Sequence, residues 1–144
     1  MLDLQSRALP HTVLSHTADT GIEALADSLA DLVHDLAVGM FGLMAKMDPC
    51  RPVRQIEANV EAGSDEDLVV DVLSELLYRS EVEDLFLCGF DVKMTGPNNV
   101  HVSAGGVDAE SVELIGPPIK AVTYHDITVS RTDHGWYGRV YFDV

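Results

Sequence analysis

The final segment of the chain limits which folds it can adopt. Apolar and aromatic side chains recur from Trp136 to Val144, a composition that predicts a strand inside a sheet. Another strand is predicted to begin at the polar residues 16–19, His-Thr-Ala-Asp. If the two strands pair, Asp19, Asp143 and the Val144 carboxylate converge, and such a set of oxygen ligands suits a hard divalent cation. The alternative is that Asp143 is a solvated strand-end residue and Asp19 belongs to a turn.

Helical and strand-like periodicities alternate along the chain. Apolar residues recur every three or four positions after Ser28 and after Ser64, which predicts two amphipathic helices. Ser28 with Asp31, and the acidic run at 65–67, are typical of helix N-termini. The expected elements are a strand within 13–25, a helix over 28–44, a strand over 53–62, a helix beginning at 64, strands over 85–94 and 100–104, an irregular segment over 108–118, a strand over 121–129 and a last strand over 136–144.

Short turns connect the later strands, as at Thr95–Asn99 and Asp133–Gly135. Strands joined in this way must be antiparallel. We therefore predict an α+β fold in which two helices pack on one face of a mixed, mainly antiparallel sheet of about six strands. The length of 144 residues suits a single domain, with residues 1–11 as an N-terminal extension.

The net charge of the chain limits the classes of partner that it can be expected to bind. Nine Lys and Arg residues against 24 Asp and Glu residues give a formal net charge of -15, and a field of this sign repels a phosphate backbone. Direct nucleic-acid binding over a broad surface is therefore not expected, whereas basic partners or cations are. The alternative is that the acidity serves solubility alone.

The sequence is typical of a cytoplasmic protein. It contains no apolar run of about 18 residues that could span a membrane, and residues 1–10 lack the apolar core of a secretory signal. Cys50 and Cys88 lie far apart and outside any metal-site spacing. We therefore predict that they are reduced thiols rather than a disulfide pair.

One lysine is a candidate functional residue. Lys120 lies in the segment Ile119–His125 and is the only lysine after Lys93. A cation beside a carboxylate cluster could hold a phosphate or an acidic group of a partner. Equally, a lysine at the edge of a strand can protect that edge against aggregation.

Several motifs together resemble the archease family. They are His16–Ile22, Met40–Met44, Leu68–Tyr78, Ile119–His125 and Val140–Val144. They occur in the family's order from about Thr12 to the end of the chain, so the resemblance implies one archease-like domain over 1–144. It also implies an accessory protein rather than an enzyme. Archeases assist an RtcB-type RNA ligase in tRNA splicing or RNA repair, where they promote guanylylation and multiple turnover of the ligase.

The resemblance also implies site residues. Family structures carry a divalent metal ion, assigned as calcium, at positions that correspond to Asp19, Asp143 and Val144 here. The functionally required lysine of the family corresponds to Lys120. No catalytic residue is implied, and no membrane partner. His16 would either orient Asp19 or be a buried structural histidine.

This chain departs from the family pattern at two positions. Ser15 stands where a glutamate is common, and Pro118 stands where an acidic residue is common. Neither change touches the expected metal ligands, but Pro118 bears on how Lys120 is presented to a partner.

Two other functions compete with the accessory role. A stand-alone phosphoester hydrolase would use a metal ion held near Asp19 and Asp143, with Lys120 and His125 assisting. A general acidic chaperone or scaffold would depend on no single one of these residues. The sequence offers no nucleophile and base at a fixed local spacing, which favours the accessory role.

Overall fold

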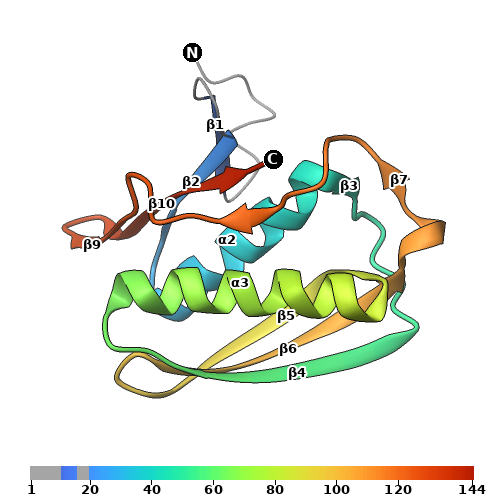
Figure 1. Cartoon of the computed structure of the whole chain (residues 1–144). Helices are drawn as coiled ribbons and strands as arrows, with labels where there is room; N and C mark the ends of the chain where they lie inside the picture. The colour runs from blue at the N-terminus through green and yellow to red at the C-terminus, as the bar shows by residue number, and fades with distance from the viewer. Residues whose placement is uncertain (1–10, 16–19) are drawn as a thin grey trace.

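The structure, a computed structural model, describes residues 11–15 and 20–144. In those ranges two helices, α2 (Leu29–Met44) and α3 (Asp65–Glu83), form a layer between two antiparallel sheets, as Figure 1 shows. The predicted α+β class, with two helices and mainly antiparallel strands, is confirmed. The strands differ from the prediction in number and arrangement, because ten are described and they divide among three sheets.

The first sheet is built around the final strand. It contains β1 (His11–Ser15), β2 (Thr20–Ala26), β10 (Gly135–Asp143), β8 (Ala121–Val122) and β9 (Thr128–Thr132). β10 pairs with β2 on one side and with β8 and β9 on the other, always antiparallel. Thr20 faces Phe142, so the strand that follows residues 16–19 pairs with the final strand, which is the condition that the predicted carboxylate cluster requires. His11, assigned to the N-terminal extension from the sequence, is the first residue of β1.

The second sheet covers the other side of the helices. Its order is β4 (Arg54–Glu61), β6 (Asn99–Asp108), β5 (Leu85–Gly96). β5 and β6 form the predicted hairpin, whose turn contains Asn98 at a left-handed φ of 55°. The register of this pair shifts between Cys88 and Asp91, where Gly89 has a φ of 62°. This geometry is that of a β-bulge, which bends the strand locally.

Both helices begin where the sequence predicts. The side chains of Ser28 and Ser64 each accept a hydrogen bond of 3.1 Å, from the backbone N–H of Asp31 and Asp67 respectively. Such a cap contributes about 0.5–2 kcal/mol to stability. The apolar face of α2 is wide because the helix packs against strands of both sheets. Its buried residues are Leu29, Leu32, Val33, Leu36, Ala37, Gly39, Met40, Phe41 and Met44.

The prediction of one continuous strand over 121–129 is wrong for the residues in the middle of that range. The structure has two short strands there, β8 and β9, separated by a turn in which Asp126 adopts a φ of 51°. The Thr123 hydroxyl accepts the N–H of His125 at 3.3 Å, a local bond that competes with the sheet ladder. Upstream, the irregular segment contains the 3-10 turn Ala109–Ser111 and β7 (Glu113–Leu114), which pairs with β3 (Ala45–Lys46).

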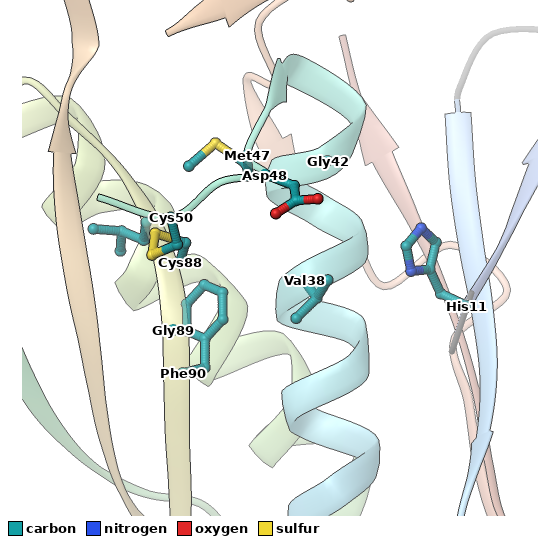
Figure 2. A pocket seen from close by; sticks show the side chains of 10 residues that line it. His11, Val38, Gly42, Met47, Asp48, Cys50, Cys88, Gly89 and Phe90 are labelled. Atoms are coloured by element: carbon teal, nitrogen blue, oxygen red, sulfur yellow. A yellow bond between two sulfur atoms is a disulfide. The ribbon is translucent and has the colours of Figure 1, made fainter. Parts of the chain in front are cut away.

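The prediction of two reduced cysteines is also wrong. Cys50 and Cys88 form a disulfide, with Cα atoms 6.0 Å apart. The loop after β3 brings them together (Figure 2), because its end runs along the central strand β6: the Val53 N–H donates to the Gly106 carbonyl at 2.8 Å. Sequence spacing carries no information about this docking of loop on sheet.

The length and hydropathy of the helices show whether either of them could span a membrane. In the part of the chain that the structure describes, neither α2 nor α3 is long and apolar enough to cross a bilayer.

Candidate functional site

The candidate site lies where β10 ends. Thr20 of β2 faces Phe142, which in turn faces Val122 of β8. Phe142 is fully buried, whereas Asp143 and Val144 are exposed. The buried phenylalanine therefore fixes the end of the strand and leaves the two following residues at the surface. Two of the predicted site residues, His16 and Asp19, lie outside the described residues.

Lys120 is held beside this strand end by its backbone. Its N–H donates a hydrogen bond of 2.7 Å to the carbonyl of Asp143. The preceding residue, Ile119, is buried and its N–H donates to the Met44 sulfur at 3.4 Å. Because Ile119 anchors the segment in the core, the Lys120 side chain is left exposed at the surface. The structure thus brings the backbones of Lys120 and Asp143 together, and the proline at position 118 does not prevent this contact.

A shallow pocket borders Lys120 on the side of α3. It has a volume of about 260 Å³ and is lined by Ser74, Leu77, Tyr78, Glu81, Lys120, Ala121 and Val122. The Tyr78 side chain is 59% exposed, although it belongs to the helix that contributes the apolar face of the core. Lys120 therefore lies next to an exposed aromatic ring and a carboxylate, a mixed surface of the kind that protein partners contact.

The turn between β8 and β9 forms another border of the site. Thr123 donates twice to the Tyr141 carbonyl, from its N–H at 3.1 Å and from its hydroxyl at 2.9 Å. The His125 ring meets the Tyr141 ring at 5.9 Å between centroids, at an angle of 60°. His125 is thus packed against an aromatic ring of β10, two residues before Asp143.

Tyr124 ties the same turn to α3. Its hydroxyl donates to the Asp67 carboxylate at 2.8 Å. This hydrogen bond raises the pKa of Tyr124 above its usual value, with burial and the charge of Asp67 adding to the effect. The bond fixes the turn over the start of the helix, and so limits how far the segment after Lys120 can move.

The predicted metal set cannot be assembled from the described residues alone. In the ranges 11–15 and 20–144, no three His, Cys, Asp or Glu side chains gather closely enough to hold a metal ion. Asp143 and Val144 end β10, but Asp19 lies outside these ranges. The set of Asp19, Asp143 and Val144 therefore stays a prediction, as does the role of His16.

Sequence reasoning missed two features of this surface. Tyr78 ends the helical motif Leu68–Tyr78 and has no function assigned from the sequence; only its place beside Lys120 makes it a candidate contact residue. The exposed phenol of Tyr124 is likewise ordinary in sequence, and its contact with Asp67 joins segments far apart in the chain. Both residues lie within motifs of the family resemblance, but nothing in the sequence indicates that they are exposed beside this site.

The fold and the sequence can be compared with those of known proteins. The profile of the Archease protein family (MTH1598/TM1083) matches residues 11–144. The protein archease of Methanopyrus kandleri is 29% identical over 140 residues, which cover 94% of this chain and 100% of that protein. The probable protein archease of Mycobacterium tuberculosis is 28% identical over 139 residues, covering 93% of this chain and 74% of that protein.

Two solved structures share the architecture. Protein 1598 of Methanobacterium thermoautotrophicum has a TM-score of 0.79 at 24% identity, over 94% of this chain and 99% of that one. An archease from Thermotoga maritima, described as a possible chaperone, has a TM-score of 0.66 at 20% identity, over 91% of this chain and 94% of that one. Because the family profile extends from β1 through the end of β10, this chain belongs to the archease family.

Proposed function

We propose that this protein is a cytoplasmic, non-catalytic accessory factor of an RtcB-type RNA ligase. In this role it promotes guanylylation and multiple turnover of the ligase in tRNA splicing or RNA repair. The observation that supports the proposal most directly is the hydrogen bond from the Lys120 N–H to the Asp143 carbonyl. Through this bond the backbone of Lys120 lies beside the end of β10, which supports a joint role for this lysine and the expected carboxylates.

The strand end also suits the expected metal ion. Asp143 and Val144 are exposed at the end of β10, and Thr20, which directly follows Asp19 in the chain, faces Phe142. We propose that Asp19, Asp143 and the Val144 carboxylate hold one divalent ion, calcium by resemblance. Carboxylate oxygens favour calcium, magnesium or manganese over softer metals. When bound, the ion would neutralise the charge of these carboxylates.

The proposed action is a shift of the ligase toward its active state. The chain has a formal net charge of -15, so Lys120 and the ion together would present positive charge within a negative surface. Such a patch can engage an acidic or phosphorylated group of the ligase. Activation requires that the protein bind the guanylylation-competent state more tightly than the resting state, because a ligand with equal affinity for both shifts nothing.

The test of this role is the guanylylation rate of an RtcB-type ligase with and without the protein. The wild type should accelerate the reaction, and Lys120→Ala should abolish most of the acceleration. The matched control is Lys93→Ala, since Lys93 is an exposed residue of β5 whose ion pair with Asp91 spans 3.7 Å. Both lysines are exposed, so each substitution should change the free energy of unfolding by less than about 0.5 kcal/mol.

The outcomes of this assay distinguish the accessory role from the two competing functions. Equal losses in the Lys120 and Lys93 variants would show that total charge matters and not the site, which is the outcome expected of a general acidic scaffold. No acceleration by folded wild type would refute the accessory role. Turnover of a phosphoester by the protein alone, with Mg²⁺ or Mn²⁺, would support the hydrolase instead.

The metal site has an independent test in thermal unfolding. A ligand that binds only the folded state stabilises it by about 2.7 kcal/mol at a concentration 100 times its dissociation constant. Calcium should therefore raise the unfolding temperature of the wild type but not of Asp143→Asn. Asp133→Asn is the control, because Asp133 is exposed in the turn before β10. An equal calcium effect in all three proteins would refute the assignment of Asp143.

A further inference from the structure

A groove with polar walls lies between the edge strand β4 and helix α3. β4 forms one edge of the three-stranded sheet, and Figure 1 shows it running below α3. The groove has a volume of about 400 Å³, and the pocket at Lys120 is distinct from it because that pocket lies between α3 and β8. The residues that line the groove are Asn59, Val60, Glu61, Asp71, Ser74 and Glu75.

The open edge of β4 presents backbone groups to this groove. Alternate residues of a strand direct their N–H and C=O groups to opposite sides. Even-numbered positions bond toward β6, since the Ala62 N–H, directly after β4, donates to the Asn98 carbonyl at 3.0 Å. The N–H and C=O groups of Asn59 and Glu61 therefore point away from β6. Within residues 11–15 and 20–144, no hydrogen bond reaches these groups, and unpaired strand groups of this kind can pair with another chain.

Side chains close the edge at both ends of this open stretch. The Glu57 carbonyl accepts a hydrogen bond of 2.9 Å from the Arg79 guanidinium of α3. Beyond the other end of β4, the Asn98 side chain donates to the Asp65 carboxylate at the start of α3. The strand from position 59 to position 61 stays open between these two contacts. A segment that pairs here is therefore short, with about two or three residues in register.

The walls of the groove carry negative charge without a cation. Asp71 and Glu75 lie one turn apart on α3, and Glu61 lies on the strand. Among the described residues, none of these three carboxylates forms an ion pair. Burial, and then the charge of Asp67, raise the pKa of Asp71 above its usual value. A Lys or Arg side chain that entered the groove would supply the missing positive charge.

This charge also decides between two kinds of occupant. A second copy of the chain would pair its own β4 with this one and would bring the glutamates at positions 57 and 61 of both strands close together. Like charges across a strand pair are destabilising, and each copy carries a formal net charge of -15. A basic segment of another protein meets attraction in place of this repulsion.

We propose that the edge of β4 binds an extended segment of another protein as an additional strand, with a Lys or Arg side chain directed at Asp71 and Glu75. Sheet edges in other proteins bind peptides in this way. The basic residue lies opposite Val60, whose side chain packs on the core beneath α3. Residues that face each other project to the same side of a sheet, so the cation lies next to the helix. Its two neighbours exchange backbone hydrogen bonds with Asn59 and Glu61.

The probe for this site is the capped peptide Ac-Val-Thr-Lys-Thr-Val-amide. Its dissociation constant is measured by amide chemical shifts of the isotope-labelled protein. The largest shifts should fall at Asn59 and Glu61, because their N–H groups gain acceptors. Norleucine in place of the lysine should weaken binding by about 3–5-fold.

Methylated peptides test the backbone contact from the side of the ligand. N-methylation of either threonine removes a donor that faces β4 and should weaken binding by about 3–10-fold. N-methylation of the lysine is the matched control, because its N–H points away from β4. That change should alter the dissociation constant by less than about 2-fold.

Variants of the protein test the backbone contact and the charge separately. Asn59→Pro removes one outward N–H, and an edge strand tolerates proline at such a position; the lysine peptide should bind more than about 10-fold more weakly. Asn59→Ala keeps this N–H and should bind like the wild type. Asp71→Asn combined with Glu75→Gln should bind the lysine and norleucine peptides equally. Glu110→Gln combined with Glu113→Gln removes two charges from exposed positions elsewhere and should keep the preference for lysine.

The proposal fails if the lysine peptide does not bind at millimolar concentration, or if its shifts centre away from β4. Equal binding of the lysine and norleucine peptides to the wild type would remove the role of the two helix carboxylates. Unchanged binding by Asn59→Pro would remove the strand pairing. If that variant does not fold, equal affinities of the peptides methylated at threonine and at lysine would have the same meaning. A concentration-dependent dimer that Asn59→Pro abolishes would assign the edge to a second copy instead.

Discussion

Replacing Gly21 with alanine tests how closely β2 and β10 must approach beside the strand-end site. A Cβ at this position would lie 2.6 Å from Cδ1 and 2.8 Å from Cε1 of the Tyr141 ring, and 2.8 Å from the Val140 carbonyl oxygen. The ring can turn aside, but the carbonyl belongs to the central strand of the sheet. Tyr141 is also buried and packs on His125, so even the ring has little room.

The magnitude follows from two opposing effects. Overpacking of a tight site typically costs about 1–3 kcal/mol, whereas a Gly→Ala change stabilises by about 0.4–1 kcal/mol through the unfolded chain. We therefore expect Gly21→Ala to lower the free energy of unfolding by about 1–2 kcal/mol. For a domain of this size the unfolding temperature should fall by about 3–8 °C.

Urea denaturation measures this effect, with Gly42→Ala as the control. A Cβ at Gly42 meets no atom within 4 Å, so that helical substitution should stabilise by about 0.5–1 kcal/mol. In a Tyr141→Ala background, Gly21→Ala should cost less, and the difference is the share of the ring in the clash. A Gly21→Ala protein as stable as the wild type, with an unchanged m-value, would refute the reasoning.

Three further predictions concern the core, the disulfide and a partly buried phenol. Phe142→Ala should cost about 3–5 kcal/mol in urea denaturation, because Phe142 is fully buried; a cost below about 1 kcal/mol would contradict its place in the core. Reducing the bond between Cys50 and Cys88, which are 38 residues apart, should lower the free energy of unfolding by about 3–4 kcal/mol through loop entropy; equal stability with and without reductant would show that the disulfide does not form. Burial, and the hydrogen bond of 2.6 Å to Glu23, raise the pKa of Tyr137 to about 12. Its contribution to stability is therefore complete below pH 10 and lost as the pH rises toward 12, and ultraviolet titration should lose one late-ionising tyrosine in Tyr137→Phe.

Local periodicity was sufficient to predict the helices and the hairpin. The serine caps at Ser28 and Ser64 are where the sequence places them, because capping depends on residues only three positions apart. The same local logic failed over 121–129, where apolar alternation continues through a turn. Thr123 and Asp126, which has a left-handed φ, interrupt the strand there. Neither residue is a glycine or a proline, the residues that mark a turn in a sequence.

Contacts between distant segments were predictable only in part. The sequence predicts strands at both ends of the chain but leaves their pairing as a condition, and the structure shows that β2 and β10 do pair. The disulfide does not follow from the sequence, because it depends on a loop that docks on β6 through Val53 and Gly106. The groove between β4 and α3 does not follow either, since it depends on β4 being an edge strand and on the helix lying along that edge. At the strand-end site, the neighbours Lys120 and Asp143 were both candidates, but the hydrogen bond that joins them was not foreseen.

The position of β10 also bears on how the chain folds during synthesis. This strand emerges from the ribosome after every other described element, yet it lies between β2 and the pair β8 and β9. Until it arrives, β2 has an unpaired edge, and the part of α2 that packs on β10 is uncovered. The sheet formed by β4, β5 and β6 has all of its strands earlier and can form first. Nascent chains halted before Gly135 should therefore expose an apolar surface to chaperones, and the candidate site can form only in the last step of folding.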